Sequence, residues 1–268
     1  MSKLLPGGVW TGDERRQGFA FHPVTGAFEQ TVLEHVDDGA MRPFEVTRML
    51  LASLASLGGA APTEAAIREL SVGDRSFLMR RLAIHLGQDT QWLTARCARC
   101  GERFDFQLTA STLPVKAAGD GYPFATVETS LGRCRLRVPT GTDEEACVAL
   151  DAAADPARTL TRLLLIEPRT IDPEALSTDD LMAIEAAVEA ASPEVTTRAA
   201  ITCPACAAGN EVELDPSALD RGGVDTLYAD VHALASHYHW SEVEILALPR
   251  ERRERYLRMV DHAQGMTH

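Results

Sequence analysis

The feature that most constrains this chain is the arrangement of four of its six cysteines in two CxxC motifs, Cys97–Cys100 and Cys203–Cys206. Each motif offers two thiolates from one tight turn, and four such ligands form the tetrahedral set of structural Zn2+ sites. Gly101 allows the chain to reverse after the first motif, and Pro204 fixes the backbone of the second. The sequence therefore predicts one structural site with Zn2+ as the cofactor and four ligands, Cys97, Cys100, Cys203 and Cys206.

The segments around the two motifs are similar to each other at an offset of 106 residues. Strand-like residues flank each motif, and the matched positions are Phe106 and Val212, Leu108 and Leu214, Ser111 and Ser217, and Leu113 and Leu219. Two β-knuckle-β units that close one metal centre form a zinc ribbon. We expect the residues between them to be an insertion at a hairpin tip, because lengthening a loop adds little closure entropy.

The predicted fold class is α+β, with zinc-ribbon-like β knuckles, a large and mainly helical insertion, and a C-terminal helical segment. Helical periodicity and capping residues predict helices over Pro43–Leu57, Ser71–Leu86, Thr142 onward, Asp155 onward, Ser177–Ala191, Thr226–His239 and Arg250–Val260, and alternation predicts a hairpin over Thr126–Val138. The expected divisions are a strand and turn arm at 1–40, a helical segment leading into the first knuckle at 41–113, the insertion at 114–195, the second knuckle at 196–222 and the C-terminal helices at 223–268.

Other chemistries for the cysteines stay open. A thioredoxin-like dithiol is one, although neither CxxC motif opens a helix after a strand, and disulfides or free thiols are another. The two cysteines outside the motifs, Cys134 and Cys147, are expected to be buried small apolar side chains. Catalysis at the cysteine site is not expected, because four thiolates leave no coordination position for water or substrate.

No enzyme activity is predicted, since the sequence contains no phosphate-binding loop, no GxSxG motif and no HExxH motif. The net charge of −13 argues against broad nucleic-acid binding, which depends on neutralising phosphates. No apolar run approaches the ~20 residues of a membrane span, and the first residues do not form a signal peptide. A reducing cytoplasm is the expected compartment.

Three parts of the sequence carry a resemblance to a known family. They are Leu70–Arg75 (LSVGDR) with Cys97–Gly101 (CARCG), Leu136–Gly141 with the second CxxC motif, and Val231–Glu242 continuing through Ile245–Arg250 to Tyr256 and Leu257. In these runs the chain resembles baseplate-associated hub and assembly proteins of contractile-tailed phages and related contractile injection systems. The family has a proline where this chain has Ala98, a difference that leaves both cysteines in place.

The resemblance implies a non-enzymatic structural or assembly component whose partners are baseplate, tube or spike proteins. It also implies a location in the bacterial cytoplasm during assembly, and leaves open whether the protein stays in the finished particle. The alternative is a zinc-ribbon regulatory or nucleic-acid-binding module, which the acidic charge disfavours.

Partner binding is expected in the C-terminal segment, at residue types that often anchor interfaces: Trp240, Arg250, Arg253 and Tyr256. Two interpretations of Trp240 stay open, because an aromatic residue before the Ser241 cap can also pack back onto Ile245. The arginines of Arg250–Arg255 are either a solvated, self-paired helix face or a dock for an acidic protein. His237 and His239, two apart on a helix, are expected to be exposed rather than to share a metal ion.

Overall fold

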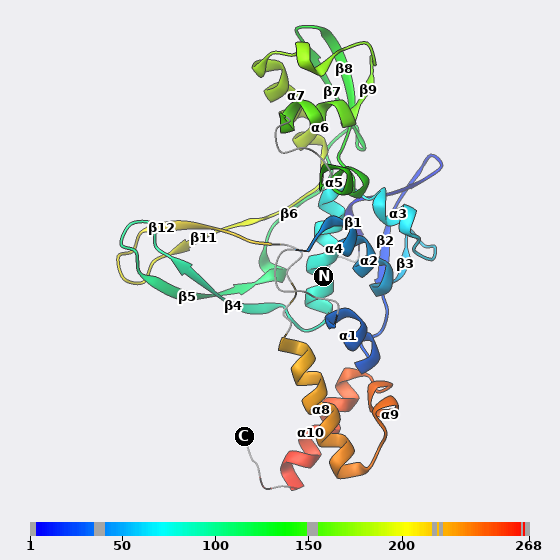
Figure 1. Ribbon diagram of the computed structural model, residues 1–268, viewed down its shortest axis with the longest axis vertical. Helices are drawn as coiled ribbons and strands as arrows, with labels where there is room; N and C mark the ends of the chain where they lie inside the picture. Colours follow the sequence, from blue (N-terminus) through cyan, green and yellow to red (C-terminus); the bar gives the residue numbers. More distant parts are fainter. Residues whose placement is uncertain are drawn as a thin grey trace.

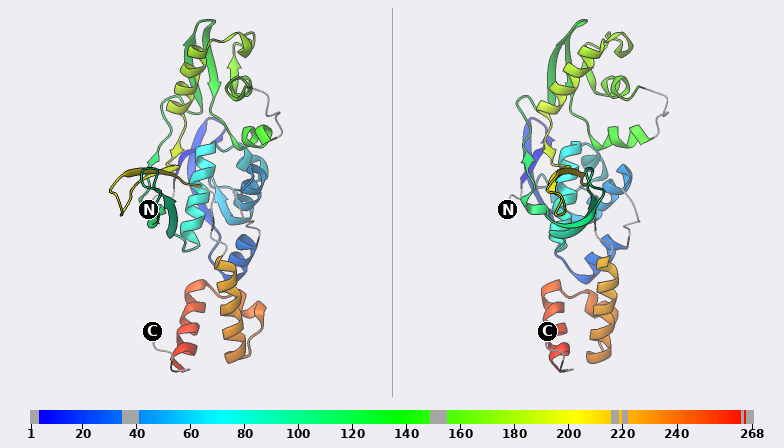
Figure 2. Two further views of the ribbon diagram at one scale, coloured as in Figure 1. Left: turned by 60° about the vertical axis from the view of Figure 1, so that its left-hand side comes forward. Right: turned by 90° about the vertical axis from the view of Figure 1, so that its left-hand side faces the viewer.

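The computed structural model describes residues 4–34, 41–148, 155–215, 219, 222–263 and 265. The chain forms a central body, a head at one end, a bundle of C-terminal helices at the other, and an arm that projects sideways (Figure 1). Head and bundle stay at opposite ends of the body in the other views (Figure 2). Each of the four parts has its own hydrophobic cluster. Because small antiparallel sheets lie beside helices throughout, the predicted α+β class is confirmed.

The body surrounds one helix, α4 (Val72–His85), whose Leu78 and Leu82 are fully buried. A three-stranded antiparallel sheet lies beside it, formed by β1 (Leu4–Thr11), β2 (Glu14–Phe21) and β3 (Leu54–Leu57). The other body helices are α1 (Gly26–Leu33), α2 (Pro43–Ser53), α3 (Glu64–Arg68) and α5 (Gly141–Val148). The predicted start of α4 is confirmed, because the Ser71 side chain accepts a hydrogen bond from the Asp74 amide.

The helix predicted over Pro43–Leu57 is wrong in its last turn. Helix α2 ends at Ser53, and the next four residues form β3, which pairs with β2. Leu54 and Leu57 are both buried in the body core. Helical spacing therefore identified the correct buried apolar residues but not their secondary structure. Their backbone N–H and C=O groups form hydrogen bonds with β2 and not within a further helical turn.

The head contains a three-stranded sheet as well as helices. Its elements are β7 (Phe124–Thr129), β8 (Gly132–Arg137), α6 (Pro156–Leu164), β9 (Leu165–Glu167), the short η2 (Pro173–Ala175) and α7 (Thr178–Ala191). The predicted hairpin over Thr126–Val138 is confirmed, and so is the Asp155 cap of α6. Apart from α5, which packs against the body, the described residues of the predicted insertion thus form a small unit of strands and helices.

The insertion begins and ends at two short strands that pair antiparallel, β6 (Val115–Lys116) and β10 (Glu194–Val195). The arm consists of two β-hairpins; β6 is the next strand after the first hairpin in the chain, and β10 is the last strand before the second. The insertion therefore joins the bases of the two hairpins. The expectation of an insertion at a hairpin tip is wrong. The tips are occupied by the CxxC turns, which leaves the bases as the place where extra chain can enter.

Helix α5 differs from the prediction in two ways. Its start is capped by Thr140, whose amide and hydroxyl donate to the Asp143 carboxylate, rather than by Thr142. Cys147 lies exposed on its last turn, so the expectation that this cysteine is buried is wrong. The helix buries Gly141 and Asp143 against the body, which turns Cys147 to solvent. Cys134 is fully buried in the head core, as predicted.

The C-terminal bundle consists of α8 (Gly222–Tyr238), α9 (Glu242–Leu246) and α10 (Arg250–Ala263). Helix α8 buries the predicted stripe of Leu227, Val231 and Leu234, and the Ser241 capping box opens α9. Among the helices that the structure describes, none combines the length and apolar character needed to cross a membrane.

A buried carboxylate joins three segments of the body and head. Asp74, on α4, is fully buried and accepts hydrogen bonds from the amides of Gly7 and Gly8 on β1, at 2.7 and 3.0 Å. It also accepts from the hydroxyl of Ser71, at 2.8 Å, and of Tyr122, at 3.3 Å. Burial raises the pKa of Asp74, and these four donors oppose the rise. The carboxylate thus fixes the position of β1 and of the head segment that carries Tyr122.

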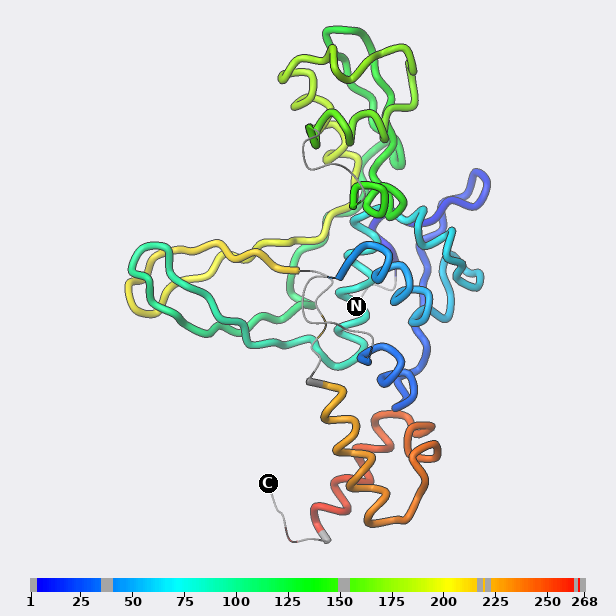
Figure 3. The backbone as a smooth tube through the Cα atoms, in the orientation of Figure 1, coloured from blue at the N-terminus to red at the C-terminus, as the bar shows by residue number. Residues whose placement is uncertain are grey.

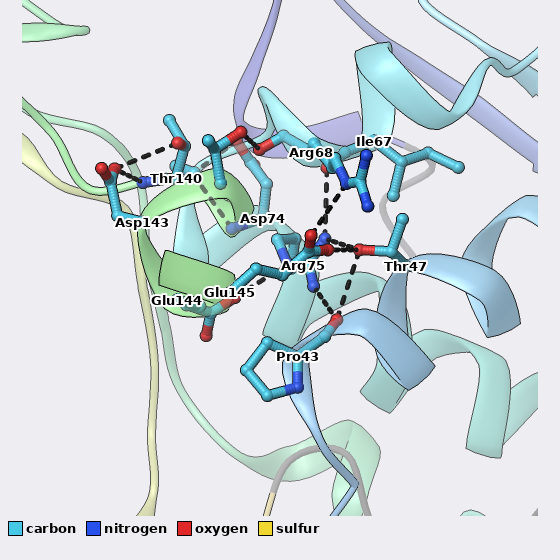
Figure 4. Close-up of polar contacts among 12 residues, drawn as sticks. Pro43, Thr47, Ile67, Arg68, Asp74, Arg75, Thr140, Asp143, Glu144 and Glu145 are labelled. Atoms are coloured by element: carbon cyan, nitrogen blue, oxygen red, sulfur yellow. Dashed lines mark hydrogen bonds and ion pairs between the residues drawn. The ribbon is translucent and has the colours of Figure 1, made fainter. Parts of the chain in front are cut away.

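The next residue, Arg75, is 1% exposed and points from α4 toward α2 and α5 (Figure 4). Its guanidinium donates to the Thr47 hydroxyl and the Pro43 carbonyl on α2, at 2.9 and 2.6 Å. It also forms a 2.8 Å ion pair with Glu144 on α5. A Cβ at Gly141 would approach the guanidinium to 2.5 Å, so α5 can pack here only through a glycine.

We predict that Asp74→Ala lowers the free energy of unfolding by about 3–5 kcal/mol, because it leaves several buried donors without an acceptor. Urea unfolding followed by circular dichroism measures this loss. The matched control is Asp13→Ala, at an exposed position, which should change stability by less than ~0.5 kcal/mol. Equal effects of the two substitutions would contradict the importance of the carboxylate.

Candidate metal centre

The arm consists of two β-hairpins that run outward to a common tip (Figure 3). The first pairs β4 (Thr90–Arg96) with β5 (Arg103–Thr109), and the second pairs β11 (Arg198–Thr202) with β12 (Gly209–Glu213). A CxxC turn closes each hairpin. The tip of the arm therefore brings together the two motifs that are far apart in the sequence.

The two hairpins share one strand register. Ala95 pairs with Phe104, and the residues at the offset of 106, Ile201 and Asn210, pair in the same way. All five pairs of β11 and β12 correspond to pairs of β4 and β5 at this offset. Leu219 is described and buried, whereas the repeat position Ser217 lies outside the described residues. The repeat predicted from the sequence is thus a structural repeat.

The turns repeat the same hydrogen bonds. The amide of Cys97 donates to the Glu102 carbonyl at 2.8 Å, and the amide of Gly101 donates to the Cys97 carbonyl at 2.9 Å. The corresponding bonds in the second turn, Cys203 to Ala208 and Ala207 to Cys203, both measure 2.9 Å. Gly101 has φ 76° and Ala207 has φ 55°, so both turns require the left-handed conformation that favours glycine.

The four sulfur atoms converge within 4.8 Å of one another. Cys97 Sγ lies 3.6 Å from Cys206 Sγ, and Cys100 Sγ lies 3.8 Å from Cys203 Sγ. A tetrahedron with Zn–S bonds of about 2.3 Å has sulfur atoms about 3.8 Å apart. The spacing is too long for a disulfide, whose sulfur atoms are about 2.0 Å apart. The cysteines therefore have the arrangement of a four-thiolate metal site, and each pair across the site joins one hairpin to the other.

The surroundings of the cluster hold the two hairpins together. Asn210 of the second hairpin accepts a 2.9 Å hydrogen bond from the amide of Ala98 in the first turn, and its side-chain amide donates to the Ala208 carbonyl. Ala95 and Phe104 are buried beside Cys97 and Cys203. This apolar cluster is small, and a bound ion would be the main cross-link at the tip.

The thiols do not ionise equally. Amides of Cys100 and Arg99 donate to Cys97 Sγ and lower the pKa of this thiol to about 6. At Cys206 the Ala208 amide favours the thiolate, but hydrogen bonds with the neighbouring thiols and burial raise the pKa to about 12. Several thiolates side by side repel one another, so a cation is needed for all four to be charged together.

The arrangement allows a metal ion to be bound. Cys97 and Cys203 are buried, and the four thiolates would complete a tetrahedron around an ion without water. The structure thus brings together the four cysteines that the sequence predicted as ligands.

Two residues predicted to bind a partner contact the body instead, Arg253 in the interior and Arg250 partly exposed. Arg253 is 2% exposed and forms ion pairs with Glu29 at 2.5 Å and Asp230 at 3.2 Å. Arg250 contacts the other Glu29 oxygen at 2.6 Å and donates to the Leu86 carbonyl. These arginines join the C-terminal bundle to the body, a role that accounts for both without a partner protein.

The other two predicted residues belong to an aromatic cluster on the bundle. Trp240 stacks on Tyr238 with ring centroids 4.8 Å apart and meets Tyr256 edge-on at 4.9 Å. Trp240 and Tyr256 are both half-buried against the bundle core, which includes Ile245. The structure therefore places the tryptophan in the packing of the bundle. His237 and His239 are exposed, as expected.

Five residues that the sequence does not single out position the parts of the molecule: Gly73, Asp74, Arg75, Glu29 and Gly141. A Cβ at Gly73 would lie 1.9 Å from the Pro193 carbonyl oxygen, so this glycine allows α4 to contact the chain entering β10. The available signal is the run LSVGDR, which predicts a helix start and carries part of the family resemblance but does not indicate buried contacts. Three consecutive residues that face three different neighbours leave no periodic pattern.

We predict that Ala207→Gly tightens metal binding and that Gly101→Ala weakens it, each by about 1 kcal/mol, or roughly fivefold in the dissociation constant. A Cβ at Gly101 meets no heavy atom within 4 Å, so the effect is conformational and not steric. Competition with a chelator measures both constants. Weaker binding by Ala207→Gly, tighter binding by Gly101→Ala, or a change in the same direction in both variants would show that backbone strain at the turns does not act on the site.

We compared the chain with models of protein families, with curated proteins and with solved structures, and none of them matches it.

Proposed function

We propose that the cluster binds one Zn2+ through Cys97, Cys100, Cys203 and Cys206, and that this ion is structural. The observation that carries the proposal is the spacing of the sulfur atoms, 3.6 and 3.8 Å across the two hairpins. Zn2+ has no geometric preference from its d electrons and favours four thiolates in structural sites. The ion would supply charge neutralisation and a fixed geometry, and no reaction.

The cross-link that zinc supplies has a large effect here because the two hairpins are joined by a long excursion of the chain. Residues 101–202 run from the first turn through the head to the second. Closing this loop is opposed by chain entropy, and metal binding contributes directly to folding in such sites. The ion therefore sets the rigidity of the arm.

At the level of the whole protein, we propose a non-enzymatic structural or assembly component of a contractile tail or injection-system baseplate. The support is the resemblance in the runs that include Leu70–Arg75 and Ile245–Arg250. In this fold those runs supply Asp74, which joins the body to the head, and Arg250, which joins it to the C-terminal bundle. They also supply Arg75, which joins α4 to two other helices of the body. Proteins that share a fold are expected to share the residues that join its parts, and these runs contain such residues. The proposed place of action is the bacterial cytoplasm during particle assembly.

We predict about one zinc per chain after purification without added metal, measured by atomic emission. Cys203→Ser should lose the ion, because three thiolates and an alcohol bind Zn2+ much more weakly. The matched control replaces the two cysteines outside the site, Cys134→Ala with Cys147→Ala, and should leave zinc content unchanged. Full zinc in Cys203→Ser, or loss of half or more in the control, would overturn the ligand assignment.

For the assembly role, we predict that deleting the gene from a strain that produces such particles abolishes intact tails in electron micrographs. Wild-type protein supplied in trans should restore them, whereas Cys203→Ser should not. Normal particles in the deletion strain would contradict the assembly role while leaving the zinc site untouched.

A further inference from the structure

The outward face of the first hairpin is exposed and carries more positive than negative charge. Its one carboxylate is Asp105, which lies opposite Thr94 and accepts a 2.6 Å hydrogen bond from the Thr94 hydroxyl. Trp92 on β4 is 70% exposed, more than any other Trp, Tyr or Phe side chain in the described part of the chain. Side chains of a strand alternate between its two faces. Thr94 and Arg96, two and four residues after Trp92 on β4, therefore lie on the same face as Trp92. Arg96 pairs directly across the strands with Arg103. Arg99 lies exposed in the turn between them.

The second hairpin shows that these arginines are not needed to form a knuckle. At the offset of 106 the positions of Arg96, Arg99 and Arg103 are taken by Thr202, Ala205 and Gly209. The two turns nevertheless share their hydrogen bonds and register. The three positive charges are therefore specific to the outer surface of the first hairpin.

The same charges are unfavourable within the isolated chain. Like charges directly opposite across two strands destabilise a hairpin. In the described part of the chain, no carboxylate lies within ion-pair distance of any of these three arginines. A surface of this kind, on a protein of net charge −13, is complementary to an acidic one.

An acidic and apolar surface lies elsewhere on the molecule, in a groove between head and body. Its cavity has a volume of about 460 Å3 and is bordered by α6, α7 and the first turn of α4. Most of the lining is apolar, including Leu160, which is 37% exposed, and Leu181 and Val188. An indole side chain buries 150–250 Å2 of surface and is of a size that such a cavity can receive.

Three glutamates border this groove, and no lysine, arginine or histidine is among its described lining residues. Glu185 and Glu189 lie one turn apart on α7, and Glu194 lies on β10. Lys116 approaches Glu194 at 3.9 Å, whereas Glu185 and Glu189 have no ion-pair partner in the described residues. The groove thus combines an apolar interior with two uncompensated carboxylates on its border.

We propose that the arm of one copy of this protein docks into the groove of a second copy, with Trp92 in the apolar cavity and the arginines of the first hairpin facing Glu185 and Glu189. The two surfaces are complementary in charge and polarity, and both belong to this chain. Because they are different surfaces, the contact is heterologous, and repeated use of it generates a ring or a filament unless two copies exchange arms. The contact goes beyond the proposed zinc site and does not depend on the baseplate assignment.

The test uses two variants of the full zinc-loaded chain. The arm variant carries Trp92→Ala with Arg99→Glu, and the groove variant carries Glu185→Arg with Glu189→Arg. All four positions are exposed, so both variants should keep the fold, which circular dichroism and zinc content verify. Wild-type protein should associate with rising concentration in sedimentation velocity. Each variant alone should be monomeric, with association weakened at least tenfold.

The mixture of the two variants decides the proposal. The arm variant keeps its groove and the groove variant keeps its arm, so an equimolar mixture should form a heterodimer that grows no further. Three results would overturn the proposal: a wild-type chain that is monomeric up to 200 µM, variants that associate like wild type, or a mixture that stays monomeric. A wild-type chain that remains monomeric but binds a DNA or RNA duplex through the same arginines would instead support the nucleic-acid-binding alternative.

Discussion

Two neighbouring side chains of one helix, Asp74 and Arg75, hold the molecule together. The carboxylate joins β1 and the head to α4, and the guanidinium joins α2 and α5 to its other side. Both are almost completely buried, so each depends on the hydrogen bonds it makes and would be strongly destabilising if left unpaired. The positions of four segments around α4 (β1, the head, α2 and α5) are therefore fixed by directional bonds and not by apolar packing alone.

The same solution recurs at the other end of the body. Glu29 on α1 is 2% exposed and receives both Arg250 and Arg253 of α10. The apolar residues of this chain are divided among four small clusters. Burial in small cores contributes little stability and has no preferred direction, so it cannot by itself fix how the four parts are oriented. Buried ion pairs that join the clusters supply the missing specificity, and they explain why arginines expected on a docking surface lie inside.

The arm follows a different rule. Its apolar cluster is centred on Ala95 and Phe104, and four cysteines occupy the place where a larger core would be. A metal ion bound by these cysteines would replace apolar volume there, and the hairpins are thin and project away from the body (Figure 1). The two hairpins share a backbone but not an outer surface. The repeat therefore separates what the metal site needs, the cysteines and the tight turns, from what the exterior of the first hairpin adds, a tryptophan and three arginines.

The sequence by itself determined the four converging cysteines, the repeat at 106 residues, the α+β class and most helix starts. These depend on local chemistry: a CxxC turn, a capping hydroxyl or an apolar stripe acts through residues a few positions apart. Only the tertiary structure decided that Leu54–Leu57 is a strand, that Cys147 is exposed, and that Arg253 is buried on Glu29, more than 200 residues away. Each of these depends on a partner distant in the chain, because the burial of a charge or the pairing of an edge strand is set by what lies opposite in space.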